Sequence, residues 1–359
     1  MRQATKRWLA LGAVLAAGAA QAQPFPSKVI RIVVPFTAGG PSDITVRNVA
    51  PRMTELLNAP GIVIDNRGGG NGFIGAEIVA KAPPDGYTLL AATATITSIN
   101  MVVFPDRPYE TLRDFQPLTT LMQTDTIFVV HPSLPVRGLK EFVALAKSRP
   151  GELSMGSGGN GSTLHLVLAL LNTQAGIKTT HVPYKGAAPG VVDVVAGQIN
   201  GMFVDLPVIS PYIKSGRVRA IAVASPKRSV YFPNVPTTAE GGYPGVRMSG
   251  YYSLLLPAKT PRDIVMKLHD AAAKTMATPE VREKFTSFGA DPLIMSPEEF
   301  TAFIRGYREM GESREGGERK SRLSGRRFGY ADAIQLASVC PNWQCSLRSA
   351  GFRKFSPSL

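Results

Sequence analysis

The chain has 359 residues, which is enough for two domains of ordinary size. Its formal net charge is +14, but the Lys and Arg residues are scattered and do not alternate with aromatic residues along one stripe. This pattern argues against a nucleic-acid interface and favours a solvated basic surface suited to anionic ligands. The two cysteines, Cys340 and Cys345, lie close to the C-terminus. We therefore expect neither a disulfide framework nor thiol chemistry in the rest of the chain.

The N-terminus has the features of a signal peptide. Three basic residues among the first seven precede an apolar stretch over residues 8–20, and Ala20-Gln21-Ala22 fits the small-x-small cleavage pattern. The stretch is short for a membrane span, and no later segment reaches the roughly 18 uninterrupted apolar residues that a span needs. We expect residues 1–22 to be cleaved after Ala22 and the mature protein to be periplasmic. A membrane anchor or a buried helix is the alternative.

Short apolar runs alternate with amphipathic helical stretches along the body of the chain. We expect strands at residues 29–35, 62–65, 87–92, 118–122, 127–131, 199–206 and 218–224. We expect helices at residues 44–57 (kinked at Pro51), 139–148 and 163–174. Further helices should begin at three Ser/Thr-Pro pairs followed by an acid, namely Thr260-Pro261, Thr278-Pro279 and Ser296-Pro297. Apolar strands that alternate with helices predict an α/β fold whose sheets are covered on both faces.

Two Gly-rich loops have the design of an anion site. The first, residues 35–43, follows a strand, and Ser42 or Asp43 can cap the helix after it. Its glycines let the backbone approach a ligand, and amide donors at a helix N-terminus favour an anion such as a carboxylate. A loop of the same kind, residues 156–163, opens the helix that contains His165. Two such loops in separate halves of the chain indicate one ligand held from both sides; ordinary strand–helix turns are the alternative.

Another Gly-rich loop, residues 66–75, matches the dinucleotide pattern G-x-G-x-x-G at Gly70, Gly72 and Gly75. In a dinucleotide site, an acid at the end of the next strand holds the ribose. Residues 92–95, Ala-Thr-Ala-Thr, stand there instead. The sequence therefore disfavours a dinucleotide cofactor, and we expect no cofactor of another kind.

Signals for catalysis are weak throughout the sequence. No serine lies in a G-x-S-x-G elbow, and none of the four histidines (His131, His165, His181 and His269) is paired at metal-ligand spacing on one helix face. Each histidine is expected in a capping, core or surface position. Asp205, after the strand at 199–204, could face a cleft or could be an exposed turn carboxylate. We expect no catalytic residue and no metal site.

At the Gly-rich loops the chain resembles a known family. It is similar to the extracytoplasmic solute receptors of tripartite tricarboxylate transporters, the Bordetella uptake gene family, and the similarity covers about residues 25–305. The matching stretches are VIRIVVPFTAGGPSD (29–43), IDNRGGGNGFIGAEIVAKAPPDGYTLL (64–90), VVHPSLPV (129–136), SGGNGSTLHL (157–166), HVPYKG (181–186), KSGRVRAIAVASPKRS (214–229) and SPEEFTAFIR (296–305).

The resemblance implies an α/β, two-domain periplasmic binding protein fold (Venus-flytrap, type II), in which each domain is a mostly parallel sheet flanked by helices. It places residues 23–123 plus 230–305 in domain 1 and residues 124–229 in domain 2, with the ligand in the cleft between them. The residues expected to bind the ligand are Thr37, Ala38, Gly39, Gly40, Ser42, Asp43, Thr93, Thr95, Gly158, Gly159, Asn160, Gly161, Ser162 and Asp205.

The sequence departs from the family pattern in three places. Ala38 stands where the first loop usually has proline, and residues 94–97 differ from the commoner polar, Gly-containing version. The acid near Asp205 usually lies one position earlier, where Val204 stands, which puts a role for Asp205 in doubt.

The function implied is that of a monomeric periplasmic receptor, with no enzymatic activity, which closes around a small carboxylate and delivers it to the integral membrane subunits of a tripartite transporter. The alternatives are a nucleotide-dependent α/β enzyme, or a periplasmic sensor or chaperone subunit of the same fold.

The C-terminal part fits this pattern poorly. An amphipathic helix that begins near Phe300 should dock on domain 1, but its periodicity fails after Arg305, and residues 306–359 are expected to form an aberrant, disordered tail. Read one base later, the codons of Met310-Gly311 must contain TGG, a tryptophan codon, and the codons around it permit D-I-E-K-W-G-K-V-V-K-A-A-N, the family's usual ending. Our hypothesis is a frameshift near Arg305; a genuine basic extension is the alternative.

Overall fold

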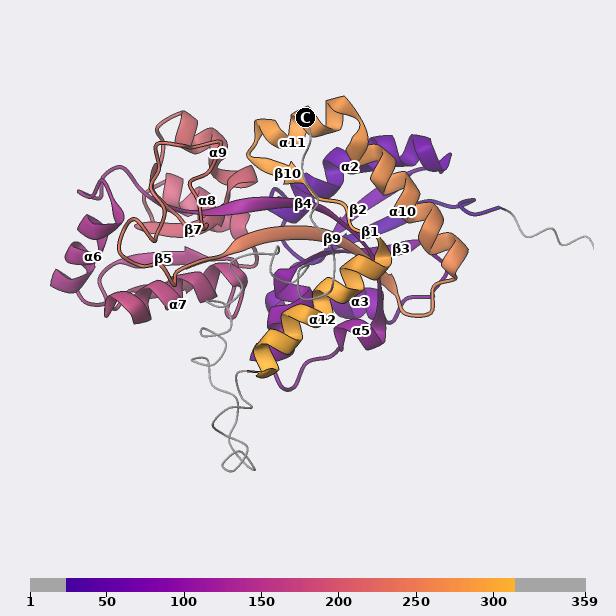
Figure 1. The fold of residues 1–359 in the computed structure, drawn as a ribbon, viewed down its shortest axis with the longest axis horizontal. Helices are drawn as coiled ribbons and strands as arrows, with labels where there is room; N and C mark the ends of the chain where they lie inside the picture. The colour runs from indigo at the N-terminus through magenta and orange to yellow at the C-terminus, as the bar shows by residue number, and fades with distance from the viewer. Residues whose placement is uncertain (1–23, 314–359) are drawn as a thin grey trace, which may run out of the picture.

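The computed structural model describes residues 24–313 as two lobes joined by two long strands (Figure 1). The expected signal peptide and the tail after Ser313 lie outside the described residues. The joining strands are β4 (Phe115–Val130) and β9 (Ser249–Pro257), which pair antiparallel along most of the length of β9. Residues 115–125 of β4 belong to the sheet of domain 1, and residues 126–130 belong to the sheet of domain 2.

The sheet of domain 1 has the strand order β2-β1-β3-β9-β4, and a short strand, β10, also pairs with β4. Its outer strands, β1 (Ile30–Val34), β2 (Ile62–Asn66) and β3 (Thr88–Thr93), are parallel. The pairs β3–β9, β9–β4 and β4–β10 (Ala290–Pro292) are antiparallel.

The sheet of domain 2 repeats this arrangement. Parallel strands β6 (Thr180–Pro183), β5 (Ser154–Ser157) and β7 (Gly201–Asp205) lie side by side, and β4 pairs antiparallel with β7 and with β8 (Arg219–Val223). The expected two-domain fold is confirmed. The sheets, however, are mixed and not mostly parallel, because a strand that returns between domains must run against its neighbours.

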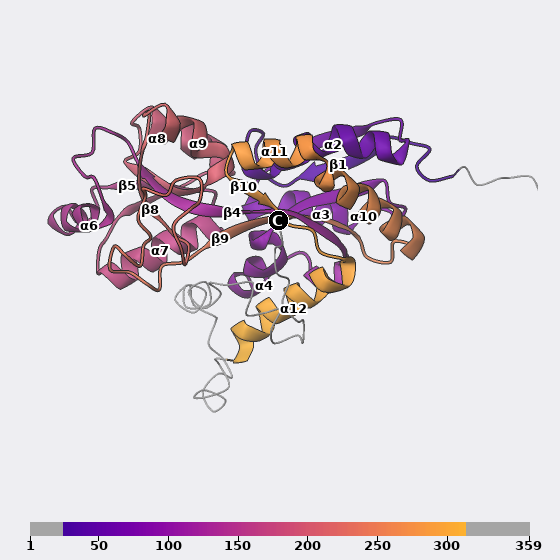
Figure 2. The same ribbon diagram turned by 45° about the horizontal axis from the view of Figure 1, so that its top comes forward.

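Helices cover both faces of each sheet. In domain 1, α2 (Pro41–Leu57), α10 (Arg262–Ala277) and α11 (Pro279–Ser287) lie on one face (Figure 2). The opposite face carries α3 (Phe73–Ala80), the short helices α4 (Asn100–Val103) and α5 (Thr111–Asp114), and α12 (Pro297–Ser313). In domain 2, α6 (Leu139–Ser148) and α7 (Thr163–Ala175) pack opposite α8 (Ala187–Val195) and α9 (Leu206–Lys214).

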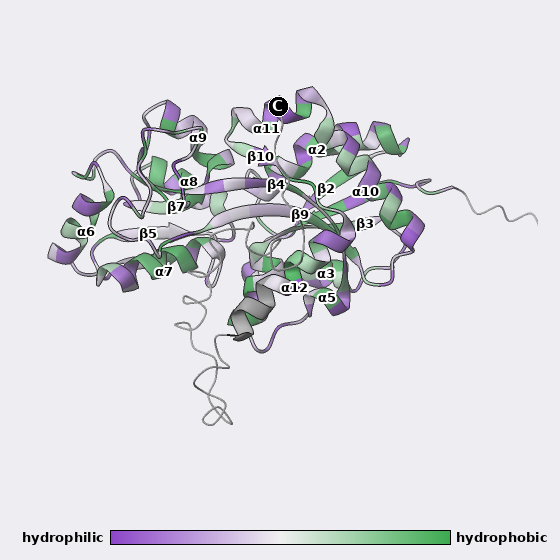
Figure 3. Cartoon of the chain, viewed as in Figure 1, coloured by the Kyte–Doolittle hydropathy of each residue, from purple (hydrophilic) through white to green (hydrophobic). Residues whose placement is uncertain are grey.

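Each sheet therefore has an apolar cluster on either side. In domain 1, Met53 and Leu268 belong to one cluster and Phe300 to the other. In domain 2, Phe142 and Ile209 belong to separate clusters in the same way. Burial on both faces is the reason that the strands read as uninterrupted apolar runs. Figure 3 shows the hydrophilic residues mainly on outer helix turns, as in α6 and α10.

Several local expectations need correction. The apolar runs at 118–122 and 127–131 belong to one strand, β4, whose polar residues 123–126 lie where the chain passes between domains. Ser296 and Glu299 form the expected capping box, each accepting the other's backbone N–H. Thr260 and Thr278 do not cap, since their hydroxyls donate to the carbonyls of Pro257 and Thr275. Helix α2 contains Pro51 and ends at Leu57, as expected.

The residues just before β9 pack with domain 2. Val246 and Met248 lie in an apolar cluster of domain 2 with Phe142, and the Met248 N–H donates to the Ala224 carbonyl at 2.7 Å. We expected the chain to return to domain 1 at residue 230; we now propose that it returns along β9. At the C-terminal end, α12 continues to Ser313 and does not stop near Arg305.

Candidate ligand-binding cleft

A pocket, called the inner pocket below, lies between the two domains next to the joining strands. It contains about 510 Å³ of empty space, including its open mouth. Domain 1 contributes Phe36, Pro41, Ser42, Thr93, Ala94 and Thr95. Domain 2 contributes Gly158, Ser162, Thr163, Leu164, Gly186, Ala187 and Asp205. The joining strand β9 contributes Gly250, Tyr251 and Tyr252.

Four helices begin at this pocket. The first turns of α2, α7 and α8 contribute Ser42, Thr163 and Ala187, and Asp205 is the residue that precedes α9. The N-terminus of a helix presents free amide donors and the positive end of the helix dipole. Several such ends around one cavity make it a site for an anion, without any basic side chain.

The first Gly-rich loop is held by Asp43. The Asp43 carboxylate accepts the Gly39 N–H at 2.9 Å and forms an ion pair with Arg47 at 2.9 Å. Burial acts to raise the pKa of Asp43, but the hydrogen bonds from Arg47 and Gly39 outweigh it and leave this pKa below its ordinary value. Asp43 is therefore ionised and holds the loop in place through these contacts. Nearby, the Thr37 hydroxyl is buried without a hydrogen-bond partner among the described residues.

The Gly-rich loop at residues 156–163 contacts two stacked histidines. The rings of His165 and His181 lie 3.6 Å apart between centroids. His165 Nδ1 accepts the Gly161 N–H at 3.0 Å, and His181 Nε2 lies 2.6 Å from the Ser157 hydroxyl oxygen. Burial, with a smaller contribution from His181, lowers the pKa of His165 to about 3. Burial also lowers the pKa of His181, so two neutral histidines hold the loop through Gly161 and Ser157.

The two domains touch across the cleft. The Thr37 N–H donates to the Lys185 carbonyl at 3.3 Å, and the Thr163 N–H donates to the Thr95 hydroxyl oxygen at 3.3 Å. A Cβ atom at Gly186 would lie only 2.7 Å from Thr37 Oγ1. These contacts describe a closed arrangement, in which residues of both domains surround the inner pocket.

A second cavity, the outer pocket, continues the cleft on the other side of Phe36 and Gly158. It contains about 760 Å³ of empty space, including open solvent. Gly159 and Asn160 line it, and it faces the G-x-G-x-x-G loop over Gly69–Phe73. In that motif, Gly75 does not line either pocket. A Cβ there would lie 2.8 Å from Pro35 Cα, so this glycine is required for the packing of α3 against the end of β1.

The expected ligand residues separate into three groups. Those that line the inner pocket are Ser42, Thr93, Thr95, Gly158, Ser162 and Asp205. Gly159 and Asn160 line the outer pocket. The remaining residues shape the loops without lining either pocket, namely Thr37, Ala38, Gly39, Gly40, Asp43 and Gly161. The sequence interpretation missed Tyr251 and Tyr252, because β9 is remote in the sequence and reaches the cleft only through strand pairing.

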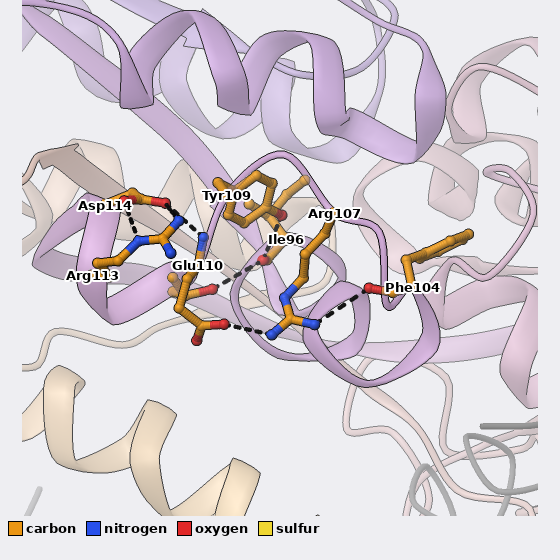
Figure 4. A network of polar contacts seen from close by, with 8 residues as sticks. Ile96, Phe104, Arg107, Tyr109, Glu110, Arg113 and Asp114 are labelled. Carbon is orange, nitrogen blue, oxygen red and sulfur yellow. Dashed lines mark hydrogen bonds and ion pairs between the residues drawn. The ribbon is translucent and has the colours of Figure 1, made fainter. Parts of the chain in front are cut away.

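Thr95, which lines the inner pocket, is the first residue of a π-helix, η3 (Thr95–Ile99). Figure 4 shows how the segment after η3 holds it in place: the Tyr109 hydroxyl donates to the Ile96 carbonyl at 2.8 Å, and Arg107 forms an ion pair with Glu110. Burial raises the pKa of Tyr109, so its hydroxyl remains a neutral donor. The Thr97 hydroxyl of the same π-helix donates to the Thr93 carbonyl and lies 2.5 Å from the Tyr251 hydroxyl oxygen, with which it shares a second hydrogen bond.

No helix within residues 24–313 is both long and apolar enough to cross a bilayer. No cluster of three or more His, Cys, Asp or Glu side chains in this range could hold a metal ion.

Comparisons with known proteins agree on one family. The model of the tripartite tricarboxylate transporter family receptor (TctC) matches residues 45–311. Protein BugT of Bordetella pertussis is 33% identical over 284 residues, which is 79% of this chain and 87% of BugT. The structure of Rpa4515 from R. palustris with adipate is 33% identical, with a TM-score of 0.77 over 81% of this chain and 97% of that one.

MatC of Rhodopseudomonas palustris, solved with bound malate, is 30% identical, with a TM-score of 0.75 over 78% of this chain and 96% of that chain. The family match, the shared two-domain fold and the cleft lined by helix N-termini are consistent with one another. The chain belongs to the receptor family of tripartite tricarboxylate transporters.

Proposed function

We propose that this protein is a periplasmic receptor that encloses a small carboxylate in the inner pocket and passes it to the membrane subunits of a tripartite transporter. It acts as a monomer and catalyses no reaction. The observation that carries the proposal is the convergence of four helix N-termini on a cavity between two domains. Such a cavity binds an anion through backbone amides and exchanges it by hinge motion.

The neighbours support a carboxylate as the ligand. Rpa4515 was solved with adipate and MatC with malate, and both share this fold along nearly their whole length. The buried hydroxyl of Thr93, which lines the inner pocket, has no partner among the described residues, and a ligand can supply one. The residues that we propose to contact the carboxylate are Ser42, Thr93, Thr95, Gly158, Ser162 and Asp205.

The alternative function, that of a nucleotide-dependent enzyme, has less support than that of a carboxylate receptor. Its motif is explained by packing, since Gly75 contacts Pro35, and the carboxylate expected for a ribose is missing from residues 92–95. A periplasmic sensor or chaperone of the same fold would bind no transporter subunit. Co-purification of the receptor with the membrane subunits of a tripartite transporter separates that function from the one proposed.

Calorimetry tests the proposal directly. Protein that has been unfolded, dialysed and refolded to remove bound ligand is titrated with malate, adipate, aspartate and benzoate. We expect at least one acid to bind at a stoichiometry of one. No heat with any acid, at protein concentrations that would detect a Kd of about 1 mM, would contradict the proposal.

A pair of variants on α8 locates the site. Ala187 lies in the inner pocket and is 6% exposed, whereas Val192 on the same helix is 61% exposed. Ala187→Phe should fill the pocket and abolish binding. Val192→Phe places the same ring in solvent and should bind as the wild type does. Equal binding by both variants would place the ligand elsewhere.

A further inference from the structure

The inner pocket contains a carboxylate where an anion is expected to bind. Asp205 is the only charged side chain among the described residues that line this pocket, and it is 4% exposed. It ends β7 and precedes α9, so its position is fixed by both elements. A buried negative charge within an anion site needs an explanation.

Hydrogen bonds hold Asp205 against the two joining strands. Its Oδ1 accepts the Thr126 hydroxyl of β4 at 2.6 Å, and its Oδ2 accepts the Tyr252 hydroxyl of β9. Gly250 allows this approach, because a Cβ there would lie 2.7 Å from Oδ2. The carboxylate is therefore tied to both strands that join the domains.

No positive charge from residues 24–313 compensates Asp205. Within residues 24–313 no Lys or Arg forms an ion pair with it. The titratable groups that face it are Asp125 of β4 and Tyr252 of β9, and the adjoining turn of α9 adds none. Two like charges that share a buried site disfavour joint ionisation, so a bound carboxylate and an ionised Asp205 oppose each other.

We infer that Asp205 takes up one proton from solvent when a carboxylate binds and then donates a hydrogen bond to it. This inference rests on the proposed function and adds a proton to it. One carboxylate anion, one Asp205 carboxylate and one proton give a complex with a single shared negative charge. Asp205 is then a ligand-binding residue that makes capture dependent on pH.

The environment of Asp205 favours this step before any ligand arrives. Burial raises the pKa of Asp205 above its ordinary value; the hydrogen bonds from Thr126 and Tyr252 act against burial, and the charge of Asp125 adds to it. Burial also raises the pKa of Tyr252 well above its ordinary value, so that the phenol stays neutral. A second carboxylate in the pocket would raise the pKa of Asp205 further.

The sign of the pH dependence follows from these directions. In the complex the pKa of Asp205 is higher than in the free protein, so binding takes up a proton between the two values. Over that interval the affinity falls as the pH rises, by up to about tenfold per pH unit. Above both values the repulsion is complete, and below both values the affinity no longer changes through this group.

Calorimetry with adipate and malate between about pH 6 and about pH 9 tests the inference, because free carboxylates are already ionised across that range. Titrations in two buffers with different ionisation enthalpies give the number of protons taken up. We expect an uptake approaching one proton in part of the range for the wild type and none for Asp205→Asn. At the alkaline end, Asp205→Asn should bind at least about tenfold more tightly than the wild type.

The control is Asp291→Asn, since Asp291 also accepts a tyrosine hydroxyl, that of Tyr231 at 2.6 Å, but lines neither pocket. It should behave as the wild type does. If Asp205→Asn does not fold, Asp205→Ser removes the same charge. Proton uptake that persists without Asp205, or a wild-type affinity independent of pH, would overturn the inference alone. Failure of every protein to bind either acid at any pH would instead count against the proposed function.

Discussion

Gly186 is the position where a single methyl group should act on domain closure. An alanine there would place Cβ 2.7 Å from Thr37 Oγ1, 3.2 Å from Thr37 N and 3.3 Å from Phe36 Cβ, whereas ordinary contacts begin at 3.4 Å. Overpacking of this kind costs about 1–3 kcal/mol. Gly186 lies in domain 2 and the atoms that it meets lie in domain 1, so opening of the cleft relieves the clash.

The cost therefore applies to the closed, ligand-binding state and not to the open state. If closure becomes less favourable by that amount, the apparent Kd for a carboxylate should rise about 5-fold to about 150-fold in Gly186→Ala. Isothermal titration calorimetry gives the Kd. Small-angle scattering at a ligand concentration that saturates the wild type but not the variant should show a smaller decrease in the radius of gyration for Gly186→Ala.

Backbone strain must be separated from the clash. Gly186 has a φ of +142°, which an alanine adopts at a cost in both states. Gly242 has a φ of +100° and no atom within 4 Å of a Cβ built there, so Gly242→Ala keeps the strain without the contact. It should lower Tm and leave the Kd unchanged. A Gly186→Ala protein that binds as tightly as Gly242→Ala would refute the role of this contact in closure.

Three further changes test the stability of the fold. Burial lowers the pKa of His165 to about 3 in the folded protein, below its value of 6.5 in the unfolded chain. The contribution of neutral His165 to stability is therefore complete above about pH 6.5 and is lost as the pH falls from there toward about 3. Over this interval Tm should fall less in His165→Gln than in the wild type, and parallel plots of Tm against pH would contradict the assignment. Phe303 of α12 is 7% exposed, and the centroid of its ring lies 5.2 Å from that of Tyr251. Phe303→Ala should lower the unfolding free energy by about 3–5 kcal/mol, measured by urea titration, and should also weaken carboxylate binding, measured by calorimetry. A loss of unfolding free energy below about 1 kcal/mol would show that α12 packs less tightly than described. Gly75→Ala should lower the unfolding free energy by about 1–3 kcal/mol because its Cβ would lie 2.8 Å from Pro35 Cα, and unchanged urea midpoints would contradict the packing role of this glycine.

The residues after Arg305 can be tested by comparing two versions of the protein. A chain in which the residues after Arg305 are replaced by the family's usual ending should melt at a higher temperature, since a longer amphipathic helix buries more apolar surface on domain 1. Equal melting temperatures of the two proteins would remove the physical argument. Resequencing tests the frameshift itself, which would be refuted by an intact reading frame without the alternative ending.

The sequence by itself determined the local features of this protein. Apolar runs such as 29–35 predicted β1, because a strand covered on both faces needs apolar side chains on both faces. The Gly-rich loops at 35–43 and 156–163 predicted helix N-termini that could hold an anion, and α2 and α7 begin there. These features depend on residues that are close in the chain, and such patterns can be read without knowledge of the fold.

Only the tertiary structure decided which residues meet across the cleft. Residues 118–131 appeared as two strands, because the polar residues that pass between the domains interrupt the apolar pattern of β4. Tyr252 reaches Asp205 from 47 positions away, and Thr37 meets Gly186 only because the lobes close on each other. Pairing between distant segments and the approach of two domains leave no periodic signal in one chain. The site residues that depend on them therefore had to come from the structure.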